Sequence, residues 1–451
     1  MDLPKLLFRV TLVTFVTVVP FVAGVYSAIE KNSGYRFVKR LDADVRGALT
    51  GVGEMSLLSP EHFLQPARGP GDGVTVNRRP DDGALILLSG FFEGGNELRL
   101  IRRDGSLVRR WPVKFSEIFP DPSHLPRPPV TDWNIDLHGA LVLPDGSPVF
   151  NFEYGGLVKL DRCGNVVWTL AHETHHSVER AEGGGFWVPG RQRAGRKAES
   201  AFPPFQPPYK EDLLLKVSEA GAIEQEISVP GVLYENGLAP LLTATGGDFE
   251  RGRSDRKELL HLNKIAELSS LDAQHFPGFE AGDLLLSIRN HNLLVVMDPG
   301  ARKVRWWQVG PWIRQHDPEF VPDGTISIFN NNTYQTAFLE DQHADPAAPR
   351  DTNILRIDPR NGDTRVVFGG RPGQEMLSVL RGKHDLTADG GLLITEFEAG
   401  RVLETDASGQ VVWEYVNRYD DDNVAEITEA RLYPRDYFSV SDWTCGTGTH
   451  P

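Results

Sequence analysis

Five histidines stand at one point of a repeated sequence pattern. Each of His138, His176, His261, His316 and His384 precedes or opens a short run of the kind that forms a β-strand. A neutral imidazole can attack as a nucleophile or move a proton near neutral pH. A lone histidine is more often structural, and a repeat can preserve one that caps a turn. Five histidines at one phase of a repeat nevertheless favour a shared site.

Arg289 adds a fixed positive charge to this set. It follows an apolar run in the same repeat as His261. An arginine there could form an ordinary surface ion pair, or it could hold the oxygens of an anion. Histidines and arginine with few carboxylates suit an anionic substrate, whereas a metal ion is opposed by the arginine. Sulfuryl or phosphoryl transfer fits such a site, because its catalysis rests on positioning and positive charge.

The elements that carry these residues form six copies of one pattern. From about residue 76, Val, Ile, Leu and Phe runs alternate with Asp-Gly turns, and an Asp-to-Trp spacing of seven residues recurs. Each copy supplies about four short strands, too few to bury both faces alone. We therefore predict an all-β, six-bladed β-propeller over residues 76–440, with the histidines converging on its central channel. The copies begin near Asp82, His138, His176, His261, His316 and His384.

Longer segments interrupt this pattern. Residues 190–210 and 334–350 are predicted to be surface loops near the central pocket. The aromatic residue in the last strand of each copy is predicted to pack between blades. Trp133, Trp187 and Trp312 lie near the histidine segments, where they either line an aromatic substrate pocket or pack in the core.

An apolar segment precedes the propeller. Residues 10–29 carry no charge, and twenty helical residues span about 30 Å, the thickness of a bilayer core. Lys5 and Arg9 precede this run, as in a signal sequence. We expect a signal anchor or transmembrane helix over 1–29 that ties an exported propeller to the membrane, or else a cleaved signal and a secreted protein. Residues 30–75 form a connection with a short helix over 45–58, and 441–451 form a C-terminal tail.

Composition excludes several classes of protein. The formal charge is −15 and no basic run is present, so we expect no nucleic-acid partner. Two cysteines, Cys163 and Cys445, cannot form a disulfide framework, a Cys-rich zinc site or an iron–sulfur cluster. In an exported protein the two could pair and pin the C-terminus, and the alternative is two unpaired thiols.

Three ordered motifs then suggest a family. His261-Leu-Asn263, Ser287-Ile-Arg289 and Gln315-His316-Asp317 together resemble the bacterial arylsulfate sulfotransferases, as does His175-His176 before a Gly-rich turn. The resemblance implies a six-bladed propeller that moves a sulfuryl group from a phenolic sulfate ester to a phenol. It implies no nucleotide sulfate donor, and we expect no cofactor and no bound metal.

The resemblance also implies roles for single residues. His316 resembles the nucleophile that becomes a sulfohistidine, and His176 the general acid and base. His261 and Arg289 resemble the residues that hold the sulfuryl oxygens, and Asn263 is a further candidate for an oxygen contact.

Alternatives to these roles stay open. His138 and His175 also begin strand-like runs and compete with His176 for the acid–base role. His384-Asp385 repeats the His316-Asp317 pair. We therefore also expect His138 and His384 to contact substrate.

The sequence departs from the family in two places. Only about 45 residues separate the anchor from the propeller, where larger members carry an N-terminal β domain, so the oligomeric state stays open. Residues 266–279 lengthen the spacing between the first two motifs, and we expect them to form a loop over the channel.

Two other functions remain. One is a propeller that binds a ligand or a protein without catalysis, because this fold hosts many functions. The other is a metal-dependent hydrolase in which Glu153, Glu396 and Asp317 join the histidines as ligands.

Overall fold

The computed structural model describes residues 14–15, 17–18, 26, 60–195, 197–243, 258–333 and 352–445. The chain forms two compact units, Met1–Ser59 and Pro60–Pro451. Nearly all of the predicted anchor, and all of the helix predicted over 45–58, lie outside the described residues, as does the loop predicted over 334–350. Among the residues that are described, no helix is long and apolar enough to cross a membrane.

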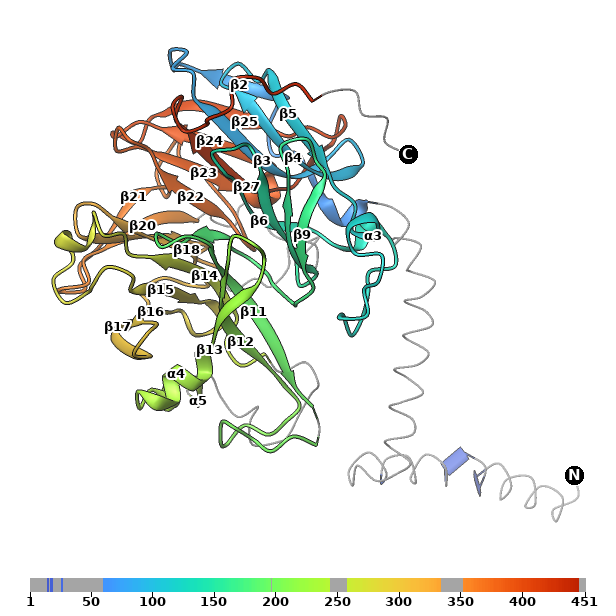
Figure 1. Ribbon diagram of the computed structural model, residues 1–451, viewed down its shortest axis with the longest axis vertical. Helices are drawn as coiled ribbons and strands as arrows, with labels where there is room; N and C mark the ends of the chain where they lie inside the picture. Colours follow the sequence, from blue (N-terminus) through green and yellow to red (C-terminus); the bar gives the residue numbers. More distant parts are fainter. Residues whose placement is uncertain are drawn as a thin grey trace, which may run out of the picture. The chain divides into compact units, whose positions relative to one another are not determined.

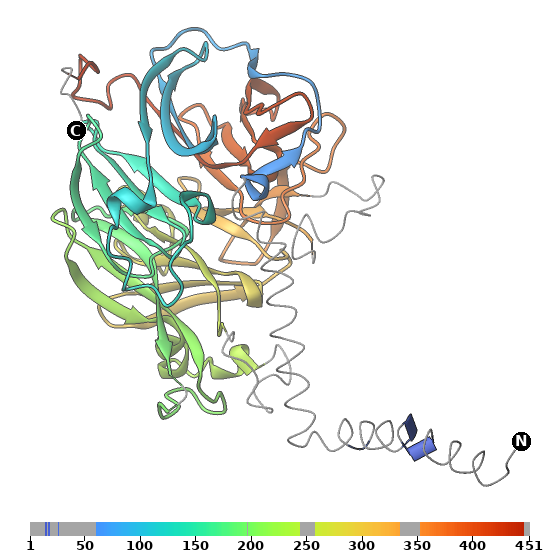
Figure 2. The ribbon, with the colours of Figure 1, turned by 90° about the vertical axis from the view of Figure 1, so that its right-hand side faces the viewer.

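The second unit is a six-bladed β-propeller, as predicted (Figures 1 and 2). Each blade is an antiparallel sheet, and the first strand named for each blade lies next to the central axis, where it contacts the first strands of neighbouring blades. Blade 1 contains β27 (Ile427–Tyr433), β3 (Leu85–Phe92), β4 (Gly95–Arg102) and β5 (Leu107–Pro112); blade 2 contains β6 (Leu137–Val142), β7 (Pro148–Phe152), β8 (Gly156–Leu160) and β9 (Val166–Leu170); blade 3 contains β10 (Glu179–Arg180), β11 (Phe186–Ala194), β12 (Tyr209–Val217) and β13 (Ile223–Ser228). Blade 4 contains β14 (Leu262–Glu267), β15 (Leu284–Ile288), β16 (Leu293–Asp298) and β17 (Lys303–Val309); blade 5 contains β18 (His316–Val321), β19 (Thr325–Asn330), β20 (Asn353–Ile357) and β21 (Thr364–Phe368); blade 6 contains β22 (Lys383–Leu386), β23 (Leu392–Glu396), β24 (Arg401–Thr405) and β25 (Val411–Val416).

Both ends of the propeller chain close the ring. The late strand β27 is the innermost strand of blade 1, whose other strands come from the start of the propeller. The early strand β2 (Gly73–Asn77) pairs with β25 as a fifth, outermost strand of blade 6, and Figure 1 shows the two side by side. A separate pair joins β1 (Leu64–Pro66) to β26 (Asn423–Ala425). The first and last blades are thus held together by three strand pairings.

Short helices occupy the connections between strands. None of them enters a sheet, so the strands alone position the channel. They are η2 (Glu61–Phe63), α3 (Phe115–Ile118), η3 (Asp132–Asn134), α4 (Val229–Glu235), α5 (Ala239–Thr243), η4 (Ala273–His275), η5 (Arg289–His291) and η6 (Phe397–Ala399).

The recurring tryptophan links neighbouring blades. The indole N–H of Trp111 in blade 1 donates to the carbonyl of Arg162 in blade 2, at 2.9 Å. Trp168 in blade 2 donates to Glu219 in blade 3 at 2.9 Å. Trp413 in blade 6 donates to Arg103 in blade 1 at 2.8 Å, across the point where the ring closes. The tryptophan therefore packs between blades, as predicted, and its indole N–H also donates to a backbone carbonyl of the next blade.

Two of the predicted loops differ from the structure. Residues 190–194 and 209–210 belong to β11 and β12, which form a long hairpin, so only the segment between them is a loop. Residues 266–267 belong to β14, so the loop predicted over the channel begins after Glu267. Glu267 pairs with Leu284, whereas Leu262 pairs with Ile288, so the connection leaves β14 at the end far from His261. An antiparallel hairpin must turn at the end of its first strand, and this turn lies at the opposite mouth.

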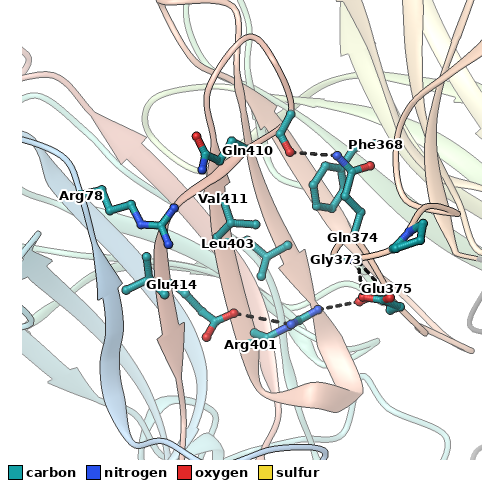
Figure 3. Close-up of a pocket in the computed structure, with 13 residues that line it drawn as sticks. Arg78, Phe368, Gly373, Gln374, Glu375, Arg401, Leu403, Gln410, Val411 and Glu414 are labelled. Atoms are coloured by element: carbon teal, nitrogen blue, oxygen red, sulfur yellow. Dashed lines mark hydrogen bonds and ion pairs between the residues drawn. The ribbon is translucent and has the colours of Figure 1, made fainter.

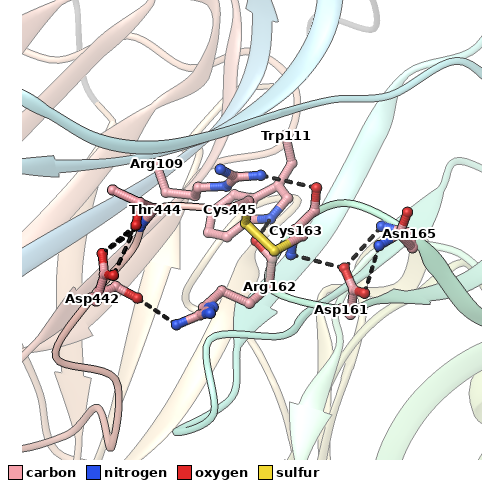
Figure 4. Close-up of a disulfide and its surroundings, with 9 residues drawn as sticks. All are labelled: Arg109, Trp111, Asp161, Arg162, Cys163, Asn165, Asp442, Thr444 and Cys445. Atoms are coloured by element: carbon pink, nitrogen blue, oxygen red, sulfur yellow. Dashed lines mark hydrogen bonds between the residues drawn. A yellow bond between two sulfur atoms is a disulfide. The ribbon is translucent and has the colours of Figure 1, made fainter. Parts of the chain in front are cut away.

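A disulfide joins Cys163 to Cys445, with Cα atoms 5.7 Å apart (Figure 4). Cys163 lies in the turn between β8 and β9, and the neighbouring Arg162 donates to the carbonyl of Asp442. Trp443 packs edge-on against Trp111. The pairing of the two cysteines thus pins the C-terminal segment to blade 2, and the alternative of two unpaired thiols is wrong.

Candidate active site

Four of the five repeat histidines meet at the axis. His138 lies in β6, His176 just before β10, His261 just before β14, and His316 opens β18, so each stands at the same end of an innermost strand. The ring of His176 is 4.3 Å from that of His138, 5.0 Å from His261 and 6.4 Å from His316, between centroids. We call these four residues the histidine cluster.

His384 lies apart from the cluster. It is in β22, but its Nε2 is 2.6 Å from the Ser327 hydroxyl and its Nδ1 is 3.6 Å from a carboxylate oxygen of Asp317. Its side chain is completely buried between blades 5 and 6. Its ring faces Ser327 and Asp317 deeper in the channel, and the contact of His384 with substrate stays a prediction.

The predicted tryptophans also serve packing. Trp312 is fully buried in an apolar cluster, and its indole donates to the carbonyl of Asn292 at 2.8 Å. Trp187 is buried and donates to Glu267 at 2.9 Å. Trp133 donates to Gly94 and packs near Phe63. An aromatic ring that lies beside the cluster is that of Tyr154, 6.4 Å from the ring of His176 between centroids.

The hydrogen bonds of Asn331 fix the tautomer of His316. The Asn331 Nδ2 group donates to the carbonyls of Ser378 at 2.8 Å and Arg381 at 2.7 Å. Its Oδ1 must therefore face His316, whose Nδ1 lies 2.7 Å away and donates to it. The Nε2 lone pair of His316 is left buried, with no hydrogen-bond partner in the described part of the chain. This is the form that a nucleophilic imidazole requires.

Side chains of the three sequence motifs contact one another at Gln315, the residue before His316. Asn263 Nδ2 donates to the carbonyl of Gln315 at 2.8 Å. The Gln315 side chain donates to the Ser287 hydroxyl and to the carbonyl of Leu293, both at 3.1 Å. These bonds join blades 4 and 5 and hold the backbone that carries His316. Asn263 and Ser287 thus act on the position of the histidine.

His261 has a carboxylate partner rather than an amide. Its Nδ1 is 2.7 Å from Glu258, which is also ion-paired with Arg191. The backbone N–H of His261 donates to Asp212 at 3.0 Å, and its φ of 72° is in the left-handed region. Backbone strain of this kind in a residue other than glycine is concentrated at functional sites. Within the described ranges, Nε2 of His261 has no hydrogen-bond partner.

Arg289 lies beside these two histidines. It follows β15, and its backbone N–H donates to the carbonyl of His261 at 3.1 Å. Burial, followed by the nearby charge of Arg314, lowers the pKa of Arg289 to about 10. Its Nε is buried and, as far as the chain is described, has no acceptor. Two guanidinium groups near each other favour an anion between them.

His138 and His176 form the other side of the cluster, and His175 adjoins them. His138 Nδ1 contacts a carboxylate oxygen of Glu153, and the other oxygen is 3.9 Å from His176 Nδ1. His175 and His176 share a hydrogen bond of 2.7 Å between their Nδ1 atoms. This arrangement can pass a proton through His176. The ligand atoms of His138, Glu153 and His176 all lie within 4.8 Å of one another, so they could also hold a metal ion.

Burial keeps the imidazoles of this site neutral. It lowers the pKa of His316 well below its ordinary value, and the charge of Arg289 lowers it further. It lowers the pKa of His176 in the same way. Burial also lowers the pKa of His138 and His261, although the neighbouring carboxylates Glu153 and Glu258 oppose it. Neutral histidines next to fixed arginines suit nucleophilic attack on an anionic ester.

Several residues of the site did not stand out in the sequence as candidate catalytic residues. Glu153 was expected only as a metal ligand, while Tyr154 and Asn331 were not expected at all. A positional signal existed for Glu153 and Asn331, because each directly follows the second strand of its blade as Arg289 does, and Tyr154 is next to Glu153. No such signal marks Arg191 or Glu258, which lie elsewhere in the repeat.

A separate pocket lies away from the cluster (Figure 3). Its volume is about 440 Å³, and residues of blades 5 and 6 line most of it. Arg401 crosses it, donating to the carbonyl of Glu375 at 2.9 Å and pairing with Glu414 at 3.5 Å. It contains none of the residues predicted to carry chemistry, so the cluster remains the candidate active site.

A model of the arylsulfotransferase (ASST) family matches residues 135–418. The chain belongs to this family. The matched segment includes the whole histidine cluster, Arg289 and Asn331, and the resemblance found from the three motifs is confirmed. No curated protein matches the chain significantly.

Solved structures similar to this arylsulfotransferase-family chain are distant. One is a protein of unknown function from Bacteroides caccae, with 12% identity and a TM-score of 0.46, covering 78% of this chain and 98% of that one. Another is virginiamycin B lyase from Staphylococcus aureus, with 10% identity and a TM-score of 0.40, covering 82% and 98%.

Proposed function

We propose that this protein transfers a sulfuryl group from a phenolic sulfate ester to a phenol, through a sulfohistidine on His316. The observation that carries the proposal is the Nε2 lone pair of His316, oriented by Asn331 and left free beside Arg289. Membership of the arylsulfotransferase family supports the choice of sulfuryl over phosphoryl transfer.

The reaction proceeds in two balanced steps. Binding of the anionic ester favours the imidazolium form of His176. His316 Nε2 then attacks the sulfur, the bond between sulfur and the aryl oxygen breaks, and this imidazolium gives its proton to the departing phenolate and becomes neutral. The acceptor phenol then returns a proton to His176, its oxygen attacks the sulfur, and the bond between Nε2 and sulfur breaks. Throughout, Nδ1–H of His316 keeps its bond to Asn331, so the ring does not rotate between the steps.

Positive charge stabilises the transferring group. Arg289 supplies a guanidinium, and His261 supplies Nε2 with Glu258 behind its Nδ1. A carboxylate in that place favours the imidazolium when an anion arrives, so Nε2–H can donate to a sulfuryl oxygen. His316 has an amide there instead, and stays neutral.

A second candidate function is metal-dependent hydrolysis, favoured by the approach of His138, Glu153 and His176. Two observations weigh against it. Glu153 is already bonded to His138, and Arg381 and Arg289 lie near the site and oppose a cation. Metal analysis of the purified protein and activity in chelator separate the two functions.

The decisive experiment uses the full-length protein with a chromogenic aryl sulfate, with and without a phenol acceptor. We expect chromophore release that depends on the acceptor, survives chelator and falls by at least about a thousandfold in His316→Ala. His275→Ala, an exposed histidine at the opposite mouth, is the matched control and should keep full activity. Release without any acceptor would indicate a hydrolase, and no release with any donor would indicate a binding propeller.

We also propose that the propeller lies outside the cytoplasm. The disulfide between Cys163 and Cys445 supports this, because such bonds persist in oxidising compartments. Whether the N-terminal segment anchors it to the membrane is tested by fractionating cells before and after a salt wash. Recovery with the membranes supports an anchor, and recovery in the soluble exported fraction supports cleavage.

A further inference from the structure

Arg381 stands in blade 6 where blades 3 and 4 carry histidines of the cluster. It lies just before β22, as His176 and His261 lie just before β10 and β14. All three have φ in the left-handed region, at 55°, 55° and 72°. The left-handed backbone is as strained for Arg381 as for the two histidines. Strain of this kind is concentrated at functional sites, which favours a functional role for Arg381.

The guanidinium of Arg381 is held firmly on one side. Its Nη2 donates to Asp136 at 2.7 Å, and its plane lies over the ring of Phe397, 4.6 Å from the ring centroid. The side chain is 15% exposed. Its Nη1 is buried and, among the residues described, has no hydrogen-bond partner. A buried charged donor without a partner is costly, so a ligand oxygen at this place would recover that cost.

The free side of Arg381 belongs to the proton-transfer half of the site. Its charge acts on His138 and on Glu153, the pair beside His176. Its carbonyl accepts from Asn331, which orients His316. Arg289 lies on blade 4 and Arg381 on blade 6, with His316 on the blade between them. The two arginines therefore flank the nucleophile from opposite sides.

We propose that Arg381 Nη1 donates to the aryl oxygen of the substrate, stabilising the phenolate that departs and later the phenolate that forms as the acceptor attacks. This inference rests on the proposed sulfuryl transfer. Arg289 and His261 serve the sulfuryl oxygens on the blade 4 side, which leaves Arg381 for the oxygen that His176 protonates. The aryl oxygen gains negative charge as its bond to sulfur breaks, and a fixed buried donor is most effective there.

The test compares donors whose phenols differ in acidity, from nitrophenyl sulfate to phenyl sulfate. In Arg381→Gln we expect kcat/KM to fall at least about tenfold more for phenyl sulfate than for nitrophenyl sulfate, because the poorer leaving group depends more on the donor. Arg381→Lys, which keeps the charge, should restore part of this difference. Arg356→Gln is the matched control, since that arginine pairs with Asp323 far from the cluster and should behave as wild type. An equal loss with every donor, or no loss, would overturn the proposal.

A binding measurement separates this inference from the proposed function. Nitrophenol bound to wild-type protein should have a lower pKa than in solution, seen as phenolate absorbance, and Arg381→Gln should abolish the shift. Wild type that binds nitrophenol in this way but transfers no sulfuryl group would overturn the proposed reaction alone. An active wild type whose bound nitrophenol shows the same shift in Arg381→Gln would overturn the role of Arg381 alone.

Discussion

The atom that faces Nδ1 decides what each histidine of the cluster can do. His316 faces the amide oxygen of Asn331, whereas His261 and His138 face the carboxylates of Glu258 and Glu153. An amide fixes the tautomer without favouring a positive charge, and a carboxylate favours the imidazolium. One residue type therefore supplies a neutral nucleophile at one place and a proton donor at another.

Replacing the amide partner by a carboxylate tests this distinction. Asn331→Asp puts an anion beside His316, favours its imidazolium and raises its pKa. The pKa of His316 in wild type is well below its ordinary value, so wild-type kcat/KM should not fall as pH decreases through about 6.5, the ordinary histidine pKa. In the variant we expect kcat/KM to fall on the acid side at a pH higher by about one unit or more than in wild type, because His316 becomes protonated there. Its activity should recover at high pH. A pH–rate profile identical to that of wild type would show that Asn331 does not control the protonation of His316.

Residue spacing predicted which residues meet, but not how they bond. His261 and His316 were predicted from their phase in the repeat, because equivalent positions on blades converge on the axis. Arg289 was predicted from its place after an apolar strand in the same repeat as His261. The hydrogen bonds of the two histidines to Asn331 and Glu258 were not predicted, since the repeat does not show which way a side chain turns. His384 illustrates the same limit, because its phase matches the repeat while its Nε2 lies beside the Ser327 hydroxyl.

At the scale of elements, the repeat predicted the order of strands within the blades. Each predicted copy corresponds to the last three or four strands of one blade. The ring closure was not predicted, because β27 and β2 lie outside the repeated pattern and complete blades far away in sequence. The mouth of the channel at which the 266–279 connection lies was not predicted, because only the pairing of β14 with β15 supplies the register.

The disulfide should stabilise this closure. It ties the segment after β27 to blade 2, across a sequence separation of 282 residues. We expect Cys445→Ser to lower the free energy of unfolding by about 2–4 kcal/mol, measured by denaturant titration with the chain oxidised. Cys163→Ser and the double variant should show the same loss, and reductant should lower wild type to that level. A single variant as stable as wild type would mean that the packing of Trp443 alone holds the tail.

At the scale of the whole molecule, charges tie the innermost strands together below the histidine cluster. Lys264 of blade 4 pairs with Glu179 of blade 3 at 2.7 Å and with Asp317 of blade 5 at 3.0 Å. Lys383 of blade 6 lies 3.2 Å from Glu429 of blade 1. Arg431 of blade 1 donates to the carbonyl of Ala140 in blade 2 at 2.8 Å. Every blade thus contributes to one network of charged and polar groups around the channel beneath the reaction site.

Within this network, we expect the replacement of Lys264 to lower the free energy of unfolding most. Its ammonium is almost fully buried, and Asp317, Glu179 and Glu319 together raise its pKa well above the ordinary value despite burial. Lys264→Met would leave carboxylates buried without their cation, so we expect the free energy of unfolding to fall by about 3–5 kcal/mol. Lys303→Met, an exposed lysine on the outer strand β17, should change it by less than about 0.5 kcal/mol. Denaturant titration of both variants at neutral pH gives the comparison. Equal stability of the two variants would show that the network does not hold the blades together.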